Sequence, residues 1–385
     1  MPDGDSISLS LHASIHEIDA RDWDACAGDD NPFVSFAFLS AVEDSGSAGP
    51  RTGWLPQHAV LRDGAGVAQG MVPLYAKSHS YGEYVFDHGW ANAFERAGGQ
   101  YYPKLQAAVP FSPVPGPRLL RRPGSSLPLA AFGQALAQAC DRLDLSSAHV
   151  TFCQEDEWQG LAEAGWLQRI GTQFHWSNNG YGNFEDFLAG MASRKRKSIR
   201  RERRDAQGAN LTFQTLRGPE ITRPLWDAFF DFYQSTVDRK WGSAYLTRRF
   251  FSLLGERLGD RVVLMLAFEG RRPVAAALNL MGQHALYGRN WGCRGDFPFL
   301  HFELCYYRAI DFAIEHGLSR VEAGAQGEHK IQRGYIPCPT WSAHWIAHSG
   351  LRRAVADFLV EERREKLEQM EQQSTFSPYR REGDE

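Results

Sequence analysis

The sequence lacks any long hydrophobic run. Its longest uninterrupted apolar stretch, residues 262–268, has seven residues, whereas a membrane-spanning helix needs about 20. Residues 1–10 are polar and acidic and contain no basic start followed by an apolar stretch, so they do not resemble a secretory signal. We therefore expect a cytoplasmic protein without a membrane-spanning helix.

Cysteine is scarce, with six residues in a chain of 385 and no C-x-x-C spacing. This usage predicts reduced thiols and no disulfide framework. His344 and His348 alternate with Trp341 and Trp345 as core residues of a strand do, and the pattern offers them no third ligand. We therefore expect no metal site.

Extreme composition is also missing. The formal net charge is −4, with 43% hydrophobic and 23% charged residues, which is ordinary for a globular protein. A chain of this length predicts two or three domains, each with its own core.

The same order of predicted elements occurs twice in the chain. The first half predicts strands at 58–64, 67–75 and 81–90, a helix at 127–143 and a strand at 149–152, and the second half predicts strands at 262–269, 273–280 and 285–291, a helix at 300–316 and a strand at 319–323. This repetition indicates a duplicated domain of mixed α and β structure. We expect a first domain at 1–170, a second at 171–365 and a polar tail at 366–385, frayed from residue 374.

A strongly basic segment spans residues 193–205, with eight basic and two acidic residues. At helical spacing Glu202 has no basic neighbour within the segment, and Asp205 has only Arg201. Arg194, Lys197 and Arg201 share one side with Arg204 and could meet phosphates. Three interpretations stay open: a solvated helix face, a site for an anionic ligand such as a nucleotide or RNA, and contact with membrane phosphates.

A second polar cluster follows the predicted strand at 319–323. Residues 321–335 combine glycines, which let the backbone approach a ligand, with Glu322, Glu328, His329, Lys330 and Arg333. A histidine beside a glutamate can act as a general base near neutral pH, and the two cations could hold a phosphate or carboxylate. The alternative is a helix start with solvent-facing polar residues. The corresponding stretch of the first half, 154–158, lacks this pattern, so we expect the first domain to be degenerate.

These segments, with 174–187, 238–242 and 326–335, resemble the GNAT-like N-acyltransferases. The closest similarity is to the predicted N-acyltransferases of peptidoglycan biosynthesis and recognition, which are related to the Fem aminoacyl transferases. The resemblance implies two tandem GNAT-like domains and transfer of an acyl group from acyl-CoA or aminoacyl-tRNA to an amine, such as a peptide or peptidoglycan-precursor amine.

The resemblance also implies site residues. His329 with Glu328 or Glu322 would be the base, and Lys330, Arg333, Arg194, Lys197 and Arg201 would bind substrate, with Lys240 and Trp241 as a wall of the acceptor pocket. The pyrophosphate loop of GNAT enzymes corresponds here to Arg289, Gly292, Arg294 and Gly295, although Arg294 stands where the family has glycine or alanine. No metal is implied. The alternative from another class is a non-catalytic module that binds RNA or an anionic carrier through 193–205.

Overall fold

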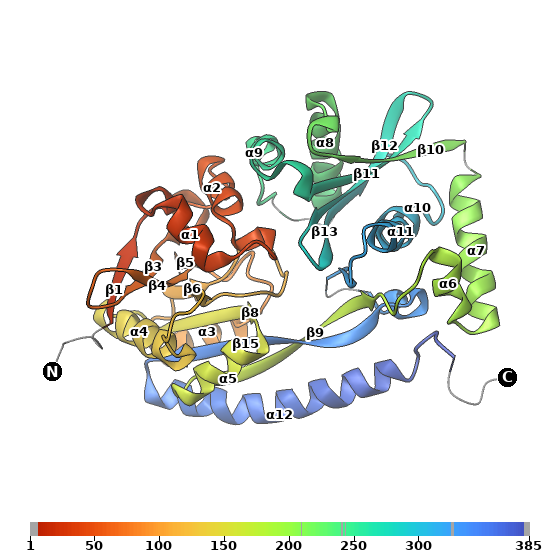
Figure 1. The fold of residues 1–385 in the computed structure, drawn as a ribbon. Coiled ribbons are helices and arrows are strands. Elements are labelled where there is room, and N and C mark those ends of the chain that lie inside the picture. The colour runs from red at the N-terminus through yellow and green to blue at the C-terminus, as the bar shows by residue number, and fades with distance from the viewer. Residues whose placement is uncertain (1–6, 209, 240–241, 243, 325–326, 381–385) are drawn as a thin grey trace. The chain divides into compact units, whose positions relative to one another are not determined.

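The computed structural model describes residues 7–208, 210–239, 242, 244–324 and 327–380. It has a mixed α and β fold (Figure 1), which confirms the predicted class. The chain divides into two compact units. Unit 1 holds Met1–Gly171 with Pro339–Glu368, and unit 2 holds Thr172–Cys338 with Gln369–Glu385. This division differs from the predicted one, which kept residues 339–365 in the second domain.

Unit 1 contains two sheets. The first has the order β1 (Ser8–His12), β3 (His58–Arg62), β4 (Ala68–Val72), β7 (Leu120–Arg121); the second has the order β2 (Trp54–Pro56), β5 (Leu74–Lys77), β6 (Lys104–Ala107), β8 (Ser147–Cys153), followed by the last residues of β15 (Ile336–Ile346). The β6 and β8 strands are parallel, and α4 (Leu129–Arg142) lies between them in the chain. A helix is the usual connection between parallel neighbours.

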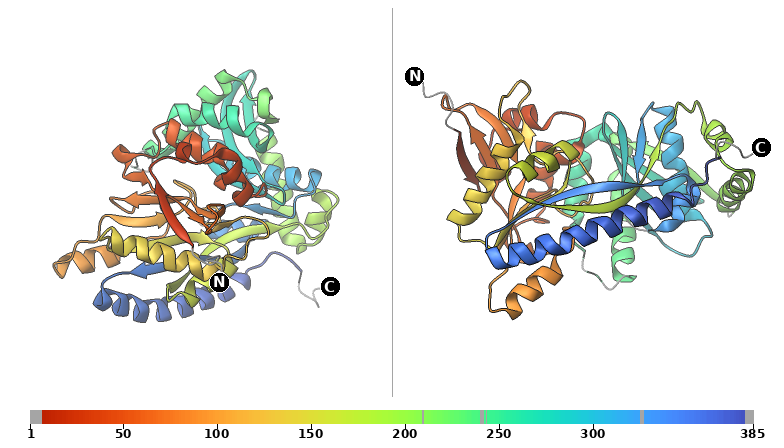
Figure 2. Two further views of the ribbon diagram at one scale, coloured as in Figure 1. Left: turned by 60° about the vertical axis from the view of Figure 1, so that its left-hand side comes forward. Right: turned by 90° about the horizontal axis from the view of Figure 1, so that it is seen from below.

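The helices of unit 1 bury one apolar face each. They are α1 (Ala20–Ala27), α2 (Phe36–Asp44), α3 (His88–Arg96), α4, α5 (Glu155–Glu163) and α12 (Ser349–Ser374), the last up to Glu368. Phe132 and Leu136, four residues apart on α4, are fully buried against the sheet. In this unit α12 runs alongside the start of β9 (Leu167–Ser177) (Figure 2), where Arg169 pairs with Glu362 at 2.7 Å.

Unit 2 is built on one sheet. Its order is β10 (Leu211–Arg217), β11 (Val262–Glu269), β12 (Arg272–Met281), β13 (Ala285–Cys293), β14 (Arg320–Glu322) and β9 (Leu167–Ser177). Neighbours are antiparallel except β13 and β14. Between this parallel pair the chain forms one helix in three parts, α10 (Leu300–Phe302), the π-helical turn η6 (Glu303–Tyr307) and α11 (Arg308–Glu315).

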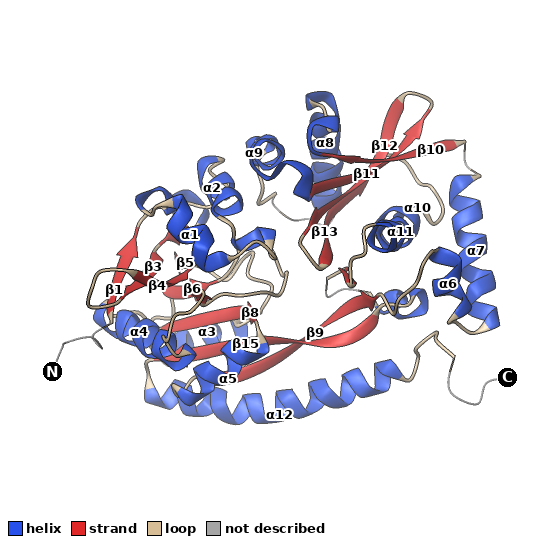
Figure 3. Ribbon diagram, in the orientation of Figure 1, coloured by secondary structure: helices blue, strands red, loops and turns tan. Residues whose placement is uncertain are grey.

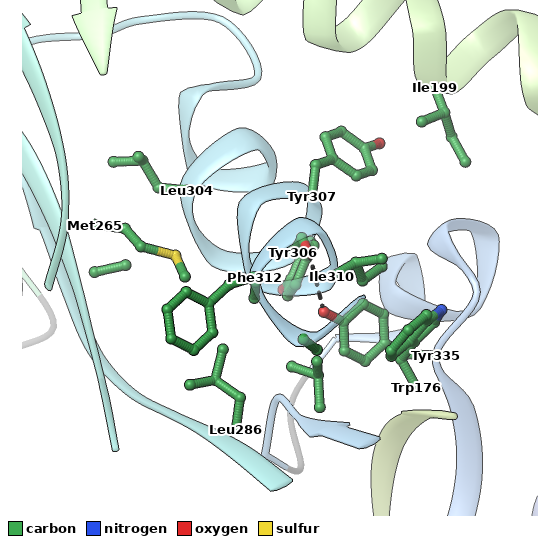
Figure 4. Close-up of a cluster of buried hydrophobic side chains, with 14 of the residues drawn as sticks. Trp176, Ile199, Met265, Leu286, Leu304, Tyr306, Tyr307, Ile310, Phe312 and Tyr335 are labelled. Atoms are coloured by element: carbon green, nitrogen blue, oxygen red, sulfur yellow. Dashed lines mark hydrogen bonds between the residues drawn. The ribbon is translucent and has the colours of Figure 1, made fainter. Parts of the chain in front are cut away.

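Helices cover both faces of this sheet (Figure 3). The other α-helices of the unit include α6 (Phe184–Ala189), α7 (Ser193–Gln207), α8 (Arg223–Arg239) and α9 (Arg248–Leu258). Its 3-10 segments include η4 (Gly218–Glu220), η5 (Gly259–Arg261) and, after β14, η7 (Glu328–Arg333). Because side chains alternate along a strand, Met265 of β11 points to the face that packs against Leu304 and Phe312 (Figure 4). Neighbouring Leu264, also fully buried, points to the other face.

The repeat seen in the sequence is present in three dimensions. In each half a parallel pair of strands flanks a helix, β6 and β8 around α4, and β13 and β14 around α10–α11. Each half then ends in a strand of 11 residues, β9 or β15. Residues 175–177 of β9 pair with β14 in unit 2, and residues 341–346 of β15 pair with β8 in unit 1. The last strand of each half therefore completes the other unit's sheet.

Three predicted elements differ from the structure. The strand predicted at 67–75 is two strands, β4 and β5, which belong to different sheets. Residues 81–90 form a loop and the start of α3 instead of a strand. The strand that precedes the helix α4 in the repeat is β6, and not residues 81–90 as predicted. The loop includes Tyr84 at φ +60°, outside the extended region. Residues 375–380 are not frayed, because the Tyr379 hydroxyl donates to the Gly334 carbonyl at 2.9 Å and Arg380 donates to Met191.

Candidate functional site

The basic helix and the Gly-Glu-His-Lys segment lie together in unit 2. The Arg333 guanidinium donates to both carboxylate oxygens of Glu202, at 2.9 and 3.1 Å. The same carboxylate accepts the Tyr307 hydroxyl, and Arg333 also donates to the His329 carbonyl at 2.7 Å. The Arg333 guanidinium lies 3.5 Å from the Phe302 ring centroid. The buried carboxylate thus joins α7 to η7 and to the π-helical turn.

The acidic partners of α7 come from other elements. Besides Arg333 for Glu202, Glu303 and Asp311 flank Arg203, with the Asp311 contact at 2.6 Å, and Glu185 pairs with Arg200. The partners that helical spacing does not provide within α7 are thus supplied to these residues by other elements. Spacing within one helix reveals only partners on that helix, whereas these acids lie at least 15 residues away in the chain.

One face of α7 remains cationic. Arg194, Lys197, Arg201 and Arg204 are all exposed, and Arg204 lies 3.4 Å from Asp205. Within the described part of the chain, the other three side chains form no hydrogen bond or ion pair. Their spacing of three and four residues places them on one side of the helix. This side of α7 carries positive charge into solvent.

His329 is exposed and lies on η7, next to the contact between Glu202 and Arg333 that joins α7 to η7. Its Nε2 atom lies 3.0 Å from the Tyr306 hydroxyl, and its ring centroid is 5.4 Å from that of Phe302 and 6.2 Å from that of His301. Partial burial, followed by the Arg333 and Lys330 charges, lowers the pKa of His329 below its usual 6.5. The imidazole is therefore neutral at pH 7, the form that can accept a proton.

Two carboxylates, Glu328 and Glu322, were predicted to assist His329, and the structure describes the side chain of Glu322 alone. The side chain of Glu328 lies outside the described part of the structure. Glu322 ends β14, is buried, and accepts a hydrogen bond from Arg320 at 2.8 Å. Its other oxygen is 3.9 Å from His175. Within the described residues Glu322 has no contact with His329, so the structure does not bring these two groups together.

Lys330 and Arg333 have structural partners. The Lys330 ammonium donates to the Ala323 and Gly324 carbonyls, at 2.6 and 3.0 Å, and burial lowers the pKa of Lys330 to about 8. Arg333 is held by Glu202 as described above. The residues are 3% and 8% exposed, so neither presents its charge to solvent, contrary to the expectation that they would hold a ligand's phosphate or carboxylate.

The segment compared with the pyrophosphate loop is mostly strand. Arg289 and Gly292 lie within β13, and a Cβ on Gly292 would meet the Phe232 carbonyl oxygen at 2.2 Å. The glycine is thus needed for close packing of α8 on β13. Only Arg294 and Gly295 lie in the connection to α10, and the Arg294 guanidinium is 3.1 Å from Asp231. The comparison with the pyrophosphate loop requires these residues to lie in a loop, but Arg289 and Gly292 lie in a strand.

A pocket of about 430 Å³ opens beside this connection. Half of its lining residues have aromatic rings, and the lining comprises Thr236, Arg239, Trp291, Cys293, Gly295, Asp296, Phe297, Phe299, His301 and Phe302. His301 and Phe302 line the pocket and also lie against the His329 ring. The pocket and the neutral imidazole therefore share a wall. Lys240 and Trp241, predicted for the acceptor pocket, lie outside the described residues.

Several residues of this site were not predicted from the sequence. Tyr306 and Tyr307 lie on the π-helical turn η6, where one added residue per turn changes the direction of the side chains; such turns are frequent at functional sites. Residue spacing gives no sign of this π-helical turn. His301 could have been identified from the sequence, because it is an imidazole at the start of a predicted helix that follows the strand carrying Trp291. In the parts of the chain that the structure covers, no group of three potential metal ligands occurs, and no helix has the length and apolarity to cross a membrane.

Two units with this repeated strand, helix and strand order place the protein in the class of tandem GNAT-like folds. The chain belongs to the FemAB-like family, described as peptidoglycan biosynthesis/recognition, whose model matches residues 14–381. This confirms the resemblance found in the sequence. No curated protein gives a sequence match.

Solved structures share the fold at low identity. The C-terminal domain of a putative lysylphosphatidylglycerol synthetase from Agrobacterium fabrum is 9% identical, with a TM-score of 0.57 over 90% of this chain and 97% of that one. FemX is 11% identical, with a TM-score of 0.53 over 91% and 100%. A protein of unknown function from Bacteroides thetaiotaomicron is 10% identical, with a TM-score of 0.53 over 88% and 99%. Family and fold together support a role of the acyltransferase type.

Proposed function

We propose that this protein transfers an acyl group from an aminoacyl-tRNA or acyl-CoA to an amine, and that the pocket beside His329 is the site of transfer. The shared wall of His301 and Phe302 between the pocket and the neutral imidazole supports this proposal most directly. The amine nitrogen attacks the acyl carbonyl carbon, and the carbon–oxygen or carbon–sulfur bond to the donor breaks. His329 takes the proton that the nitrogen loses and returns it to the departing oxygen or sulfur, which leaves as the tRNA hydroxyl or the CoA thiol.

The charges of the site favour aminoacyl-tRNA over acyl-CoA as donor. The exposed face of Arg194, Lys197 and Arg201 suits a polyanionic backbone, whereas Arg289 and Gly292 lie in a strand. The family description favours a peptidoglycan-precursor amine as acceptor. The name of the Agrobacterium relative suggests phosphatidylglycerol as a competing acceptor for the assay, with a hydroxyl in place of the amine.

Turnover with panels of aminoacyl-tRNAs and acyl-CoAs tests the proposal. Loss of a general base lowers the rate by a factor of about 10² to 10⁴, so the turnover of His329→Gln should be lower than that of wild type by this factor. His284→Gln is a matched control because His284 is exposed in the turn between β12 and β13. Equal turnover of wild type and His329→Gln would remove His329 as the base.

The second candidate is a binding module without catalysis, favoured by the same cationic face. It predicts no turnover with any donor together with tight, salt-dependent tRNA binding. Whether the protein is an enzyme or a binding module, each lost phosphate contact reduces the slope of log binding constant against log salt concentration by about one. Arg194→Gln with Arg201→Gln should reduce the slope by about two, and Arg271→Gln, exposed between β11 and β12, should leave it unchanged.

A further inference from the structure

Two lysines of unit 1 face each other inside the fold. Lys77 and Lys104 are direct partners in the antiparallel pairing of β5 and β6, which lie side by side in Figure 1, and both are fully buried. Like charges opposite each other destabilise a sheet, and burying each ammonium costs several kcal/mol unless it is well paired. Part of this cost is offset at Lys77, which donates to the Tyr81 carbonyl at 3.2 Å and lies 3.7 Å from the Trp54 ring centroid.

The counter-charges come from one loop, residues 78–87. Glu83 accepts a hydrogen bond from Lys104 at 2.7 Å and lies 3.9 Å from Lys77. Asp87 accepts from Lys104 at 2.5 Å and from the Tyr101 hydroxyl at 2.8 Å. The strands thus supply both cations, and the loop supplies both anions.

The loop buries its charged side chains and exposes its aromatic ones. Its charged residues Glu83 and Asp87 are 3% and 2% exposed, whereas its aromatic residues Tyr81, Tyr84 and Phe86 are 61%, 40% and 67% exposed. Large apolar side chains are normally the buried ones. A segment that turns its aromatic rings outward gains little from packing, so polar contacts attach it. They are the ion pairs to the lysines and hydrogen bonds to its backbone, from Lys77 and Trp54 to the Tyr81 carbonyl and from Arg169 to the Phe86 carbonyl.

The fit of the loop to the lysines is incomplete. Glu83 Oε1 and Asp87 Oδ1 are buried and have no hydrogen-bond partner among the described residues, and neither has Gln106 Oε1, two residues along β6 from Lys104. An unsatisfied buried polar atom costs about 1–3 kcal/mol. Each carboxylate therefore pairs with Lys104 through one oxygen and leaves its other oxygen without a hydrogen bond from the described residues.

We propose that Lys77 and Lys104 form an oxyanion-binding site in unit 1, which the loop at 78–87 fills with Glu83 and Asp87 until a phosphate- or carboxylate-bearing ligand replaces them. In this arrangement the loop is an internal occupant. The ligand's oxyanion takes the lysine contacts, the carboxylates move into solvent, and the aromatic rings of the loop become available to pack.

The protonation of the cluster is consistent with a replaceable occupant. Burial raises the pKa of Glu83 to about 7, opposed by Lys104 and reinforced by Asp87. Burial also lowers the pKa of Lys77 to about 7, with Glu83 opposing this shift. Lys104 keeps a raised pKa and Asp87 a lowered one. Glu83 is thus the weaker of the two internal anions near neutral pH, and its displacement costs less than that of Asp87.

Binding of inorganic pyrophosphate to the full chain tests the proposal, with succinate as the carboxylate arm. We expect hydrogen exchange of residues 78–87 to rise when the anion binds. Glu83→Gln removes the charge of one of the two internal competitors and should tighten binding about tenfold, a difference of about 1.4 kcal/mol. Lys77→Met should weaken binding at least about tenfold. Its fold is expected to persist, because Glu83 keeps its 2.7 Å contact with Lys104 and is not left as an unpaired buried charge.

The cationic face of α7 is a second place where phosphate could bind. Arg194→Gln with Arg201→Gln removes that surface and should leave the exchange response of the loop intact. The proposal is overturned if pyrophosphate and succinate leave exchange at 78–87 unchanged in wild type and in Glu83→Gln. It is also overturned if Lys77→Met binds as wild type does, or if Glu83→Gln only lowers the melting temperature.

Discussion

Glu202 and Arg333 lie 131 residues apart in the chain and are joined by two hydrogen bonds of 2.9 and 3.1 Å. Both side chains are about nine-tenths buried. This ion pair fixes the turn that carries His329 against the helix that carries the exposed cations. The position of the candidate base therefore depends on a carboxylate of the basic helix.

Breaking this pair should destabilise the protein strongly. Glu202→Gln leaves a buried guanidinium without its counter-charge, which costs about 3–5 kcal/mol, and urea denaturation measures the loss. Glu185→Gln, which breaks the exposed pair with Arg200 on the same helix, should cost less than about 1 kcal/mol. Similar small losses for both variants would contradict a structural role for the Glu202–Arg333 pair.

Gly292→Ala should destabilise unit 2 through the contact between α8 and β13. The new Cβ would lie 2.2 Å from the Phe232 carbonyl oxygen, so the helix must move, and overpacking of this kind costs about 1–3 kcal/mol. Gly89→Ala is the control, because no atom lies within 4 Å of its Cβ position. A Gly292→Ala protein as stable as wild type would show that α8 can shift without loss.

Acyl transfer should depend on pH through His329. Its pKa lies below 6.5 in the folded protein, so the imidazole loses its basic form only as the pH falls through that lower value. We expect a rate that is flat near pH 7 and falls about tenfold per pH unit below the pKa of His329. His329→Gln should lack this limb, and an unchanged acidic limb in that variant would assign it to another group.

The segment after α12 should contribute to the stability of unit 2. Tyr379 packs against the unit 2 core and donates to the Gly334 carbonyl. Tyr379→Phe should cost about 1 kcal/mol for the hydrogen bond, and Tyr379→Ala about 3–5 kcal/mol, measured by urea denaturation. Phe376→Ala, at a site 64% exposed, should change stability by less than about 0.5 kcal/mol. Equal effects at both positions would contradict the packing role of Tyr379.

Local signals predicted most of the second half. The apolar run of β11 gave its bounds, 262–269, to the residue, because a buried strand needs apolar side chains on both faces. Asn183 is of a residue type that is favoured before the first turn of a helix, and its side chain accepts from the Asp186 backbone at 3.0 Å. These elements depend on neighbours in the chain, which the sequence shows directly.

The prediction failed where distant contacts decide. Residues 81–90 have the aromatic content of a strand, but Glu83 and Asp87 are held inside by Lys104 of another strand. Lys330 and Arg333 were expected to face a ligand, yet backbone carbonyls and Glu202 hold them. A charged residue gives no sign in the sequence of whether water or a buried partner will solvate it.

The sequence alone determined the repeated order of strands and helices, the family resemblance, and the two polar segments that meet beside the pocket. Only the tertiary structure decided that the last strand of each half completes the other unit's sheet, which charges of α7 stay free, and that two lysines face each other inside unit 1. The physical reason is that periodicity and capping act over a few residues, whereas strand exchange and ion pairing join groups whose separation in the chain carries no information about their distance in space.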